Sequence, residues 1–566
     1  MINCFTNWSG RLLMLIVWAS LPAWVCRAQS RVPALDSMGA NMARENWKAA
    51  IHWALKAGEA IPSEKYWRYL NAADFASRDR NKELALHYAA LVADSDIAVK
   101  ARFGESFAWL KDDPQWQQLT RKIADRKEAE RQAKIKSARV FRDEQKAMQA
   151  QTDAFAESLS QIGSAEALYK AIRQGRPPRQ YPRGRNFVYG WTNLDGKIEL
   201  PYLVQLPPGF DGSKAYPVVV VLHGAVAYQP ETRDVPDSVD TFFGRFFMRM
   251  ASESGFIAVF PYGTKTYNWM MPEDGFGLVP EVLRQVKRLF PVDDSRVYIT
   301  GHSNGATGAF SYLMKQPSLF AGFSGINNRP QVRTGGTFFR NALNRSFYNV
   351  ATDYDYYFPL EGHQGVTRLA TQLGINWQNR EILGKRTHGF LINDQSDESL
   401  QVYTQLFADM ASKKRNPFRE RLYWECEDTQ NGRCDWLEIT RLDTLANAQS
   451  WQTPVNVPVT GWRKVMNPAE LIDSTSNAFQ FPRRSGAVQA TYAGNRFELT
   501  TSWVGKVKLF LSPEMIDFAK PLQVRINGKQ VFASRVEMDK ALMLSSYRRE
   551  SDHQAVWAAS LELAVP

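Results

Sequence analysis

Apolar side chains recur at helical spacing through the first part of the chain, with alanine and aromatic residues on one face and charged residues on the other. This pattern predicts a helical region up to residue 128, with short polar or glycine-containing turns between the helices. The predicted helices are Glu45–Ala60, Glu64–Ser77, Asn81–Ala93, Ala98–Leu110 and Gln115–Arg126. The helical pattern continues over residues 129–172, and a proline-rich hinge follows at Pro177–Gly184.

The middle of the chain alternates short apolar runs with helical patterns, which indicates a mostly parallel sheet covered by helices on both faces. Val218–Leu222 is a continuous apolar run of this kind, and a second β-rich run ends at Gly301. Further strands are predicted at Ser346–Val350 and Ile375–Leu383, with a helix over Glu361–Leu373 between them.

Beyond Arg415 the pattern changes to short alternating strands, which predicts a β-rich domain, with a sandwich as one arrangement. Arg421–Glu425 and Cys434–Ile439 are expected to form a hairpin, and Asn527-Gly528 is a strong two-residue turn signal. The later predicted strands are Phe497–Thr501, Lys506–Leu511, Leu522–Ile526 and Lys529–Val536. Five tryptophans could either build the core or form a platform for carbohydrate: Trp424, Trp436, Trp451, Trp462 and Trp503.

At 566 residues the chain is too long for a single core. The predicted organisation is multidomain: a helical region, an α/β domain and a β-rich domain. The boundaries are a signal peptide at 1–28, a helical domain at 29–128, a helical linker at 129–185, the α/β catalytic domain at 186–415 and a β-rich accessory domain at 416–566.

The amino terminus has the features of a secretory signal. Arg11 precedes the apolar stretch Leu12–Val25, and Cys26 and Ala28 supply small residues before a cut after Ala28. The apolar stretch is short for a bilayer-spanning helix, although an uncleaved anchor is the alternative. We therefore expect a secreted or periplasmic protein whose mature form does not span the membrane.

Charge and cysteine usage narrow the classes of partner. The formal net charge is +12, but the basic residues are spread along the chain without a nucleic-acid-binding fold signature, so no nucleic-acid partner is expected. Cys426 and Cys434 remain after signal removal, and a disulfide between them is left open. No histidine lies near them, which argues against a metal site.

The most informative motif is the Gly-x-Ser-x-Gly run from Gly301 to Gly305, which follows a β-rich stretch and precedes a helical pattern. A strand that reverses at once into a helix lifts the serine hydroxyl above the sheet, and this reversal leaves little room for side chains two residues before and after it. Ser303 is therefore the predicted nucleophile.

The acid and the base should follow the nucleophile in that chain order. Asp355 lies in the loop after the predicted strand Ser346–Val350 and four residues before Pro359, and Asp353 is the alternative acid. His388 lies one helix and one strand further on and is the predicted base.

Two other histidines follow the nucleophile, and neither fits the base. His363 falls too soon after Asp355 to have crossed the sheet and is interpreted as a helix-surface residue. His553 lies far along the chain in the β-rich region.

The loop after Val218–Leu222 predicts the oxyanion-binding groups. The backbone N–H of Ala225 and that of Asn304, which follows the nucleophile, are the expected donors. His223 is expected to brace this loop. Trp269, in the loop after Tyr262, is interpreted either as a substrate contact or as a buried anchor of that loop.

These motifs resemble the α/β-hydrolase esterases that are grouped with feruloyl and acetylxylan esterases and polyhydroxyalkanoate depolymerases. The resemblance spans Tyr202–Arg415 and rests on Pro217–Gly224, Phe290–Tyr298, Asp355–Pro359 and Thr387–Phe390. It implies hydrolysis of carboxylic esters, possible on polysaccharide or plant-derived substrates, without a metal or organic cofactor. Two features depart from the pattern of these esterases. The loop after His223 lacks their extra glycines, and Ala306 stands where they often have glycine.

Other functions stay open on the sequence alone. The same fold class includes prolyl oligopeptidase-like peptidases, so an amide substrate is the alternative within enzymes. The helical region resembles tetratricopeptide repeats and would then bind a peptide or protein, although a cap over the hydrolase is the other interpretation. A non-catalytic binding protein is the rival class, and a complete Ser303, Asp355 and His388 set argues against it.

Overall fold

The computed structural model describes residues 33–99, 101–178, 181, 186–194, 196–229, 245–270, 275–394, 396–443, 445, 448–464, 467–472 and 474–566. The predicted signal peptide at 1–28 lies outside these residues. The chain divides into two compact units, the first ending at Arg126 and the second beginning at Lys127. Within the described ranges, no helix is both long and apolar enough to cross a membrane.

The first unit is built from helices that pack in sequence around an alanine-rich core. Its helices are α1 (Pro33–Ala43), α2 (Trp47–Ala60), α3 (Lys65–Arg78), α4 (Lys82–Ala93) and the start of α5 (Pro114–Ser160). Asn46 and Asn81 cap α2 and α4 by accepting backbone N–H bonds. Small alanines let the helices approach closely: Ala54, Ala73 and Ala89 are fully buried.

The helix predicted over Ala98–Leu110 is wrong. Only a 3₁₀ helix over Glu105–Leu110 forms, because Gly104 before it has an extended backbone. The rings of Phe103 and Phe107 instead pack against Trp116, with ring centroids 5.2 and 4.8 Å away. The resemblance of this unit to tetratricopeptide repeats remains a prediction.

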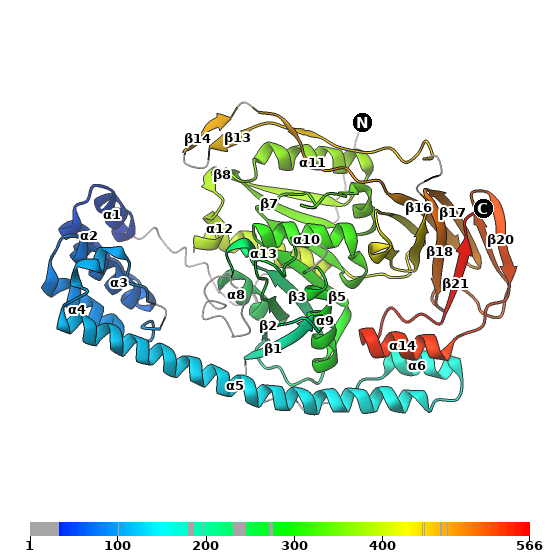
Figure 1. Cartoon of the computed structure of the whole chain (residues 1–566), viewed down its shortest axis with the longest axis horizontal. Coiled ribbons are helices and arrows are strands. Elements are labelled where there is room, and N and C mark those ends of the chain that lie inside the picture. Colours follow the sequence, from blue (N-terminus) through cyan, green and yellow to red (C-terminus); the bar gives the residue numbers. More distant parts are fainter. Residues whose placement is uncertain are drawn as a thin grey trace, which may run out of the picture. The chain divides into compact units, whose positions relative to one another are not determined.

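The second unit contains an eight-stranded, mostly parallel sheet (Figure 1). Its strands are β1 (Phe187–Leu194), β2 (Ile198–Gln205), β3 (Tyr216–Leu222), β4 (Ile257–Pro261), β5 (Val292–Gly301), β6 (Gly322–Ile326), β7 (Phe347–Tyr354) and β8 (Trp377–Thr387). Their order is β1-β2-β4-β3-β5-β6-β7-β8, and only the β1–β2 and β2–β4 pairs are antiparallel. Strand β5, which ends two residues before Ser303, is therefore central and lies between β3 and β6.

Helices cover both faces of this sheet, as the continuous apolar runs predict. They are α8 (Arg245–Glu253), α9 (Leu278–Leu289), α10 (Asn304–Lys315), α11 (Leu360–Leu373), α12 (Phe390–Asn393) and α13 (Asp397–Ser412). Successive β3 side chains point to opposite faces. Val218 and Val220 join the core formed with α9, α10 and α11, and Val219 and Val221 join the core formed with α8 and α13.

The predicted helix over residues 129–172 is interrupted. Helix α5 ends at Ser160, and α6 (Ala165–Gln174) begins after Ser164, whose side chain caps it. Phe141 and Met148 of α5 are buried in the sheet core, and Thr152 Oγ1 donates to the Arg288 carbonyl at 2.8 Å. This part of α5 therefore packs on the eight-stranded sheet.

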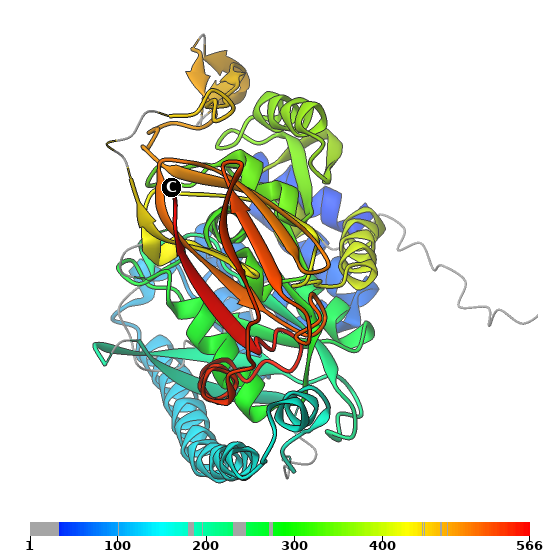
Figure 2. The same cartoon turned by 90° about the vertical axis from the view of Figure 1, so that its right-hand side faces the viewer.

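Two packed, mostly antiparallel sheets form the carboxy-terminal part (Figure 2). The strands are β9 (Arg421–Cys426), β10 (Arg433–Cys434), β11 (Leu437–Leu442), β16 (Gly486–Ala493), β17 (Arg496–Ser502), β18 (Val504–Leu511), β19 (Leu522–Ile526), β20 (Lys529–Ser534) and β21 (Ala559–Ala564). One sheet has the order β20-β19-β17-β16-β9 and the other β10-β11-β18-β21, with one parallel pair, β17–β19. Helix α14 (Lys540–Glu550) precedes the last strand.

The structure confirms one predicted hairpin in this region and contradicts the other. Asn527 and Gly528 have φ values of 51° and 79° and join β19 to β20, as the turn signal predicts. The hairpin expected between β9 and Cys434–Ile439 is wrong, because β9 pairs with β16 and β11 pairs with β18 in the opposite sheet.

Two of the five tryptophans and both cysteines belong to the core of the sandwich. Trp424 and Trp436 are fully buried, so they cannot belong to an exposed carbohydrate platform. Cys426 and Cys434 are buried free thiols, and burial raises the pKa of both.

A short arm lies between β11 and β16. Its strands are β12 (Pro458–Val459), β13 (Trp462–Lys464), β14 (Asn467–Ile472) and β15 (Ser476–Asn477), paired β12 with β15 and β13 with β14. Val457 packs against the sheet core.

Candidate active site

Ser303 lies at a sharp reversal between β5 and α10. Its backbone has φ 58° and ψ −122°, a combination that costs roughly 1–3 kcal/mol for a residue with a side chain. The N–H of Ser303 donates to the Ile326 carbonyl on the neighbouring strand at 3.0 Å. The surrounding sheet therefore holds the serine in a strained position at the end of the central strand.

The two motif glycines are required by the close approach of strand β3. A Cβ on Gly305 would lie 1.9 Å from the Leu222 carbonyl oxygen, and one on Gly301 would lie 2.4 Å from it. Position 306 accepts alanine because its neighbour on β6 is Gly325. A Cβ on Gly325 would lie 2.7 Å from the Ala306 Cβ. The departure from the glycine-rich pattern at Ala306 is thus offset on the neighbouring strand.

The structure brings the three predicted catalytic residues into one hydrogen-bonded chain. His388 Nε2 lies 2.9 Å from Ser303 Oγ, and His388 Nδ1 lies 2.7 Å from Asp355 Oδ2. The second Asp355 oxygen accepts the backbone N–H groups of Tyr357 and Phe358 at 2.8 and 3.0 Å. The Asp355 carboxylate is only 1% exposed, so its orientation toward the imidazole is fixed by the loop that carries it.

Asp353, the alternative acid, has a different set of contacts. Its carboxylate accepts the backbone N–H groups of Gly384, Lys385 and Arg386 at 2.9, 3.0 and 2.7 Å. These bonds hold the end of β8, from which the chain continues to His388. The geometry therefore assigns the imidazole contact to Asp355 and a bracing position to Asp353.

Two further side chains hold the backbone of the predicted base, and sequence reasoning missed both. Asn327 Nδ2 donates to the His388 carbonyl at 2.8 Å, and Asn327 Oδ1 accepts the Thr352 N–H at 2.9 Å. His302 Nε2 donates to the same carbonyl at 2.9 Å, and its ring packs on the His388 ring. The position of His302 inside Gly-x-Ser-x-Gly was the one available signal, but that position accepts many residue types.

His302 is held in its neutral form. Burial, and next the positive charge that His388 can carry, lower the pKa of His302 to about 3. Because the His388 carbonyl can only accept, the single proton of neutral His302 resides on Nε2. His302 is therefore a hydrogen-bond donor to the base loop across the ordinary pH range.

The predicted oxyanion loop lies against the nucleophile. A Cβ on Gly224 would meet Ser303 Cβ at 3.2 Å, and Ala225 next to it has a left-handed backbone, with φ 52° and ψ 36°. Asn304 is the first residue of α10, whose free N–H groups and dipole favour negative charge. Both predicted donors thus belong to segments that border Ser303.

His223 braces this loop, as expected. Its Nδ1 donates to the Gly224 carbonyl at 2.8 Å, and its Nε2 accepts the Gly263 N–H at 2.9 Å. The accepting Nε2 requires the neutral ring, and burial lowers the pKa of His223 to about 4. The histidine therefore links the oxyanion loop to the end of β4.

Trp269 is a buried anchor and not a substrate contact. Its side chain is 0% exposed, and its ring packs edge-on against His223 with 4.7 Å between centroids. Gly308 of α10 makes room for it, since a Cβ there would lie 2.3 Å from the indole. The indole therefore packs between Gly308 of α10 and Gly263 of its own loop.

The remaining histidines downstream of the nucleophile do not reach Ser303. His363 is not a helix-surface residue: it is 2% exposed, and its Nδ1 pairs with Asn349 Nδ2 at 2.9 Å because α11 presses this face onto the sheet. His553 Nδ1 donates to the Ile172 carbonyl at 2.7 Å, far from the triad in the fold.

Aromatic side chains border the imidazole on its accessible side. The rings of Tyr357 and Phe358 lie 4.9 and 5.4 Å from the His388 ring, and Tyr357 is 46% exposed. Both line a small pocket that Asn328 also lines, and neither polar atom of the buried Asn328 amide has a hydrogen-bond partner. An apolar rim and an unsatisfied amide thus adjoin the triad. Among the described residues, no group of three or more His, Cys, Asp or Glu side chains is placed to hold a metal.

No family model matches the chain. Among solved structures, a thermostable esterase is 19% identical, with 41% of this chain and 64% of that chain covered and a TM-score of 0.32. A ferulic acid esterase is 17% identical, with 40% and 96% covered and a TM-score of 0.32. An acylaminoacyl peptidase of Pyrococcus horikoshii is 15% identical, with 41% and 43% covered and a TM-score of 0.33. The chain spans less than two thirds of the length of the first and third of these proteins.

Strand order and site geometry define a multidomain α/β-hydrolase-like protein with the side-chain arrangement of a serine hydrolase. The antiparallel β2, the nucleophile after central β5, the acid after β7 and the base after β8 are the features that carry this assignment.

Proposed function

We propose that this protein is an exported serine hydrolase that cleaves carboxylic esters through Ser303, His388 and Asp355. The observation that carries the proposal is the continuous hydrogen-bonded chain from Ser303 Oγ through both nitrogens of His388 to Asp355 Oδ2. A buried carboxylate on Nδ1 leaves Nε2 free to accept the serine proton.

The reaction proceeds in two halves. Ser303 Oγ attacks the acyl carbonyl carbon while its proton moves to His388 Nε2, and the carbonyl oxygen becomes an oxyanion that the N–H groups of Ala225 and Asn304 bind. Collapse of the tetrahedral intermediate expels the alcohol, which takes the proton from His388. Water then attacks the acyl-enzyme with His388 as base, which releases the acid and restores Ser303.

The proposed substrate class is an acyl ester on a polysaccharide or a related plant-derived ester. Support comes from the predicted signal peptide, which would place the enzyme where such polymers occur, and from the exposed aromatic ring of Tyr357 beside His388. A peptide or protein partner for the helical unit and a secreted or periplasmic location belong to the same proposal. The peptidase alternative has the same triad and differs only in the leaving group.

The deciding experiment compares a set of esters with a set of amides. Purified protein is assayed with acetyl and feruloyl esters of xylo-oligosaccharides and with acyl-peptide p-nitroanilides, beside Ser303→Ala as the blank. The proposal predicts kcat/KM at least 100-fold higher for an ester than for any amide. Faster cleavage of an internal peptide or anilide bond would assign the peptidase function instead.

A further inference from the structure

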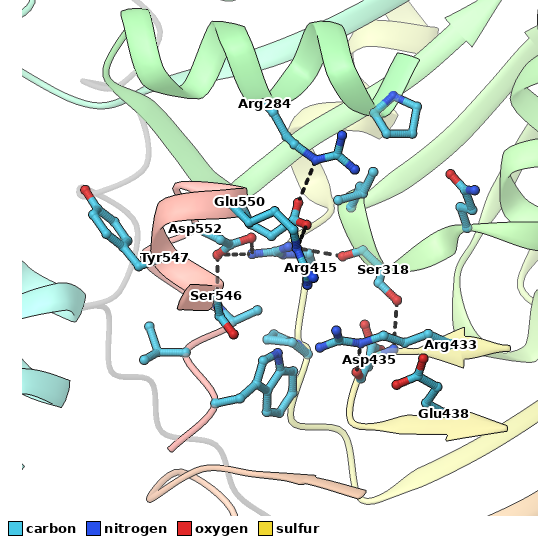
Figure 3. A pocket seen from close by; sticks show the side chains of 18 of the residues that line it. Arg284, Ser318, Arg415, Arg433, Asp435, Glu438, Ser546, Tyr547, Glu550 and Asp552 are labelled. Atoms are coloured by element: carbon cyan, nitrogen blue, oxygen red, sulfur yellow. Dashed lines mark hydrogen bonds and ion pairs between the residues drawn. The ribbon is translucent and has the colours of Figure 1, made fainter. Parts of the chain in front are cut away.

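A cavity lined by charged and polar side chains adjoins the sandwich and lies away from the triad. It has a volume of about 320 Å³ and is walled by α9, the end of α10, strands β10 and β11, and α14 (Figure 3). Lys315 and Gln316 at the end of α10 line it, whereas Ser303 stands at the start of that helix. The 12-residue helix separates the two places by about 18 Å, so the cavity is not part of the catalytic site.

Charges of both signs line this cavity in nearly equal number. The basic residues are Arg284, Lys315, Arg415, Arg433 and Arg549, and the acidic residues are Asp435, Glu438, Glu550 and Asp552. Several are paired with each other, such as Arg415 with Asp552 at 2.8 Å and Arg284 with Glu550 at 3.3 Å. A net anion or cation would meet like charges on one wall, whereas a neutral molecule with many donors and acceptors would not.

One wall offers polar groups that the protein leaves available. The Arg433 guanidinium lies over the Phe510 ring at 3.8 Å, and its Nε donates to the Asp435 carbonyl oxygen at 3.2 Å. Among the described residues, Arg433 and its cross-strand neighbour Glu438 attract each other by charge but form no direct ion pair. Asp435 Oδ1 binds Arg345 at 2.6 Å, but Asp435 Oδ2 is buried without a hydrogen-bond partner.

An aromatic and apolar surface completes the cavity. Trp557 and Val556 line it together with Met543 and Tyr547 of α14. Carboxylates, a guanidinium and an indole around one cavity match a ligand that carries hydroxyl groups on one side and C–H groups on the other. The volume lies within the range of small-molecule sites, about 300–1,000 Å³.

We infer that this cavity binds a glycosyl unit and forms a non-catalytic saccharide site between the sandwich and the hydrolase-like sheet. The hydroxyl groups of the sugar would donate to Asp435 and Glu438 and accept from Arg433, and its C–H face would lie on the apolar wall. The inference does not depend on the triad, since none of these residues touches Ser303, His388 or Asp355.

The test uses the full chain carrying Ser303→Ala, with xylobiose, cellobiose and chitobiose as probes in saturation-transfer NMR and titration calorimetry. Ser546 lies on α14 and lines the cavity, so Ser546→Trp should fill it and weaken binding at least tenfold. Ser545 is its exposed neighbour outside the lining, and Ser545→Trp is the matched control that should bind as before.

A second pair of variants covers the case in which Ser546→Trp does not fold. Glu438→Gln on the cavity wall should also weaken binding, whereas Glu498→Gln on β17, outside the lining, should not. The inference is overturned if none of the three probes binds, or if binding is equal in the wall variants and their controls. Binding of inorganic phosphate in place of the sugars would overturn it as well.

Discussion

The ring of His302 packs against the ring of the base His388, with 4.8 Å between centroids, and its Nε2 donates to the His388 carbonyl at 2.9 Å. The residue that precedes Ser303 in the chain thus holds the loop that carries His388. This contact links the elbow and the base loop directly, so that a shift in one moves the other.

Removing this donor should lower turnover without abolishing it. His302→Phe keeps an aromatic ring but loses the bond to the His388 carbonyl, so kcat on a small ester should fall about 3–10-fold, which corresponds to one hydrogen bond of roughly 1 kcal/mol. His302→Gln, which retains a donor, should lose less. Since the pKa of His302 is about 3, His302 does not titrate in the assay range. In both variants the profile of kcat against pH should therefore still fall at acidic pH with the slope of a single protonation. A shallower fall of kcat at acidic pH in His302→Phe would contradict the role of His302 as a neutral hydrogen-bond donor.

The two aspartates of the β7 loop should separate catalysis from stability. Asp355→Asn removes the acceptor that fixes the His388 tautomer, so kcat should drop on the order of 10³–10⁴-fold with little change in folding. Asp353→Asn weakens the bonds to the backbone N–H groups of residues 384–386, so it should lower the melting temperature by roughly 2–4 °C and keep most of kcat. If Asp353→Asn instead lost kcat and Asp355→Asn only lowered the melting temperature, Asp353 would be the acid.

The strained backbone at Ser303 predicts a gain in stability when the side chain is removed. Glycine accepts φ 58° without the steric cost that a Cβ brings, so Ser303→Gly should raise the melting temperature by a few degrees while it abolishes hydrolysis. Ser303→Ala keeps the Cβ and is the control, with no comparable gain. Equal melting temperatures for the two variants would indicate an unstrained elbow.

Trp269 should affect folding and not substrate choice. Trp269→Leu leaves a cavity beside His223 and α10, and truncation of a buried indole costs about 3–5 kcal/mol at most. The variant should melt earlier and lose activity by a similar factor on acetyl and feruloyl esters. A selective change in KM for one ester would instead place the indole in the substrate pocket.

Acid sensitivity should arise partly at a buried ion-pair network. Burial raises the pKa of the Asp552 carboxyl, but the nearby charges of Arg415 and Lys287 lower it more, so the net pKa lies well below its usual value. A depressed folded-state pKa stabilises the fold above the unfolded value of about 4, and this stabilisation is lost as pH falls below it. Asp552→Asn should therefore destabilise the protein at pH 7 and flatten the decline in urea stability between pH 4 and pH 2. If the free energy of unfolding of Asp552→Asn, measured by urea titration, fell as steeply from pH 4 to pH 2 as that of the wild type, Asp552 would not be a source of the acid sensitivity.

The sequence was sufficient for the parts of the site that depend on local geometry and chain order. The glycines of Gly301–Gly305 are dictated by the approach of β3, and the spacing from Asp355 to His388 is dictated by one crossover of a parallel sheet. The sharp reversal at Ser303 and the length of the crossover are local features of the chain, so they leave a readable pattern, although a neighbouring strand is what crowds the glycines.

Contacts between distant segments left no such pattern. Asn327 and His302 meet His388 only because β5, β6 and β8 end at the same edge of the sheet. The burial of Trp269 and the separation of β9 from β11 into opposite sheets depend on packing partners far away in the chain. The pattern of apolar residues predicts that a segment is buried, but it does not predict which other segment packs against it.

The most direct test of the account is covalent labelling of the nucleophile. The full chain is treated with a fluorophosphonate probe, beside Ser303→Ala and His388→Ala, and the labelled peptide is mapped by mass spectrometry. The account predicts one adduct, on Ser303, that is absent from Ser303→Ala and strongly reduced in His388→Ala. A folded wild-type protein that takes no label, or that is labelled equally in His388→Ala, would contradict an activated serine at this site.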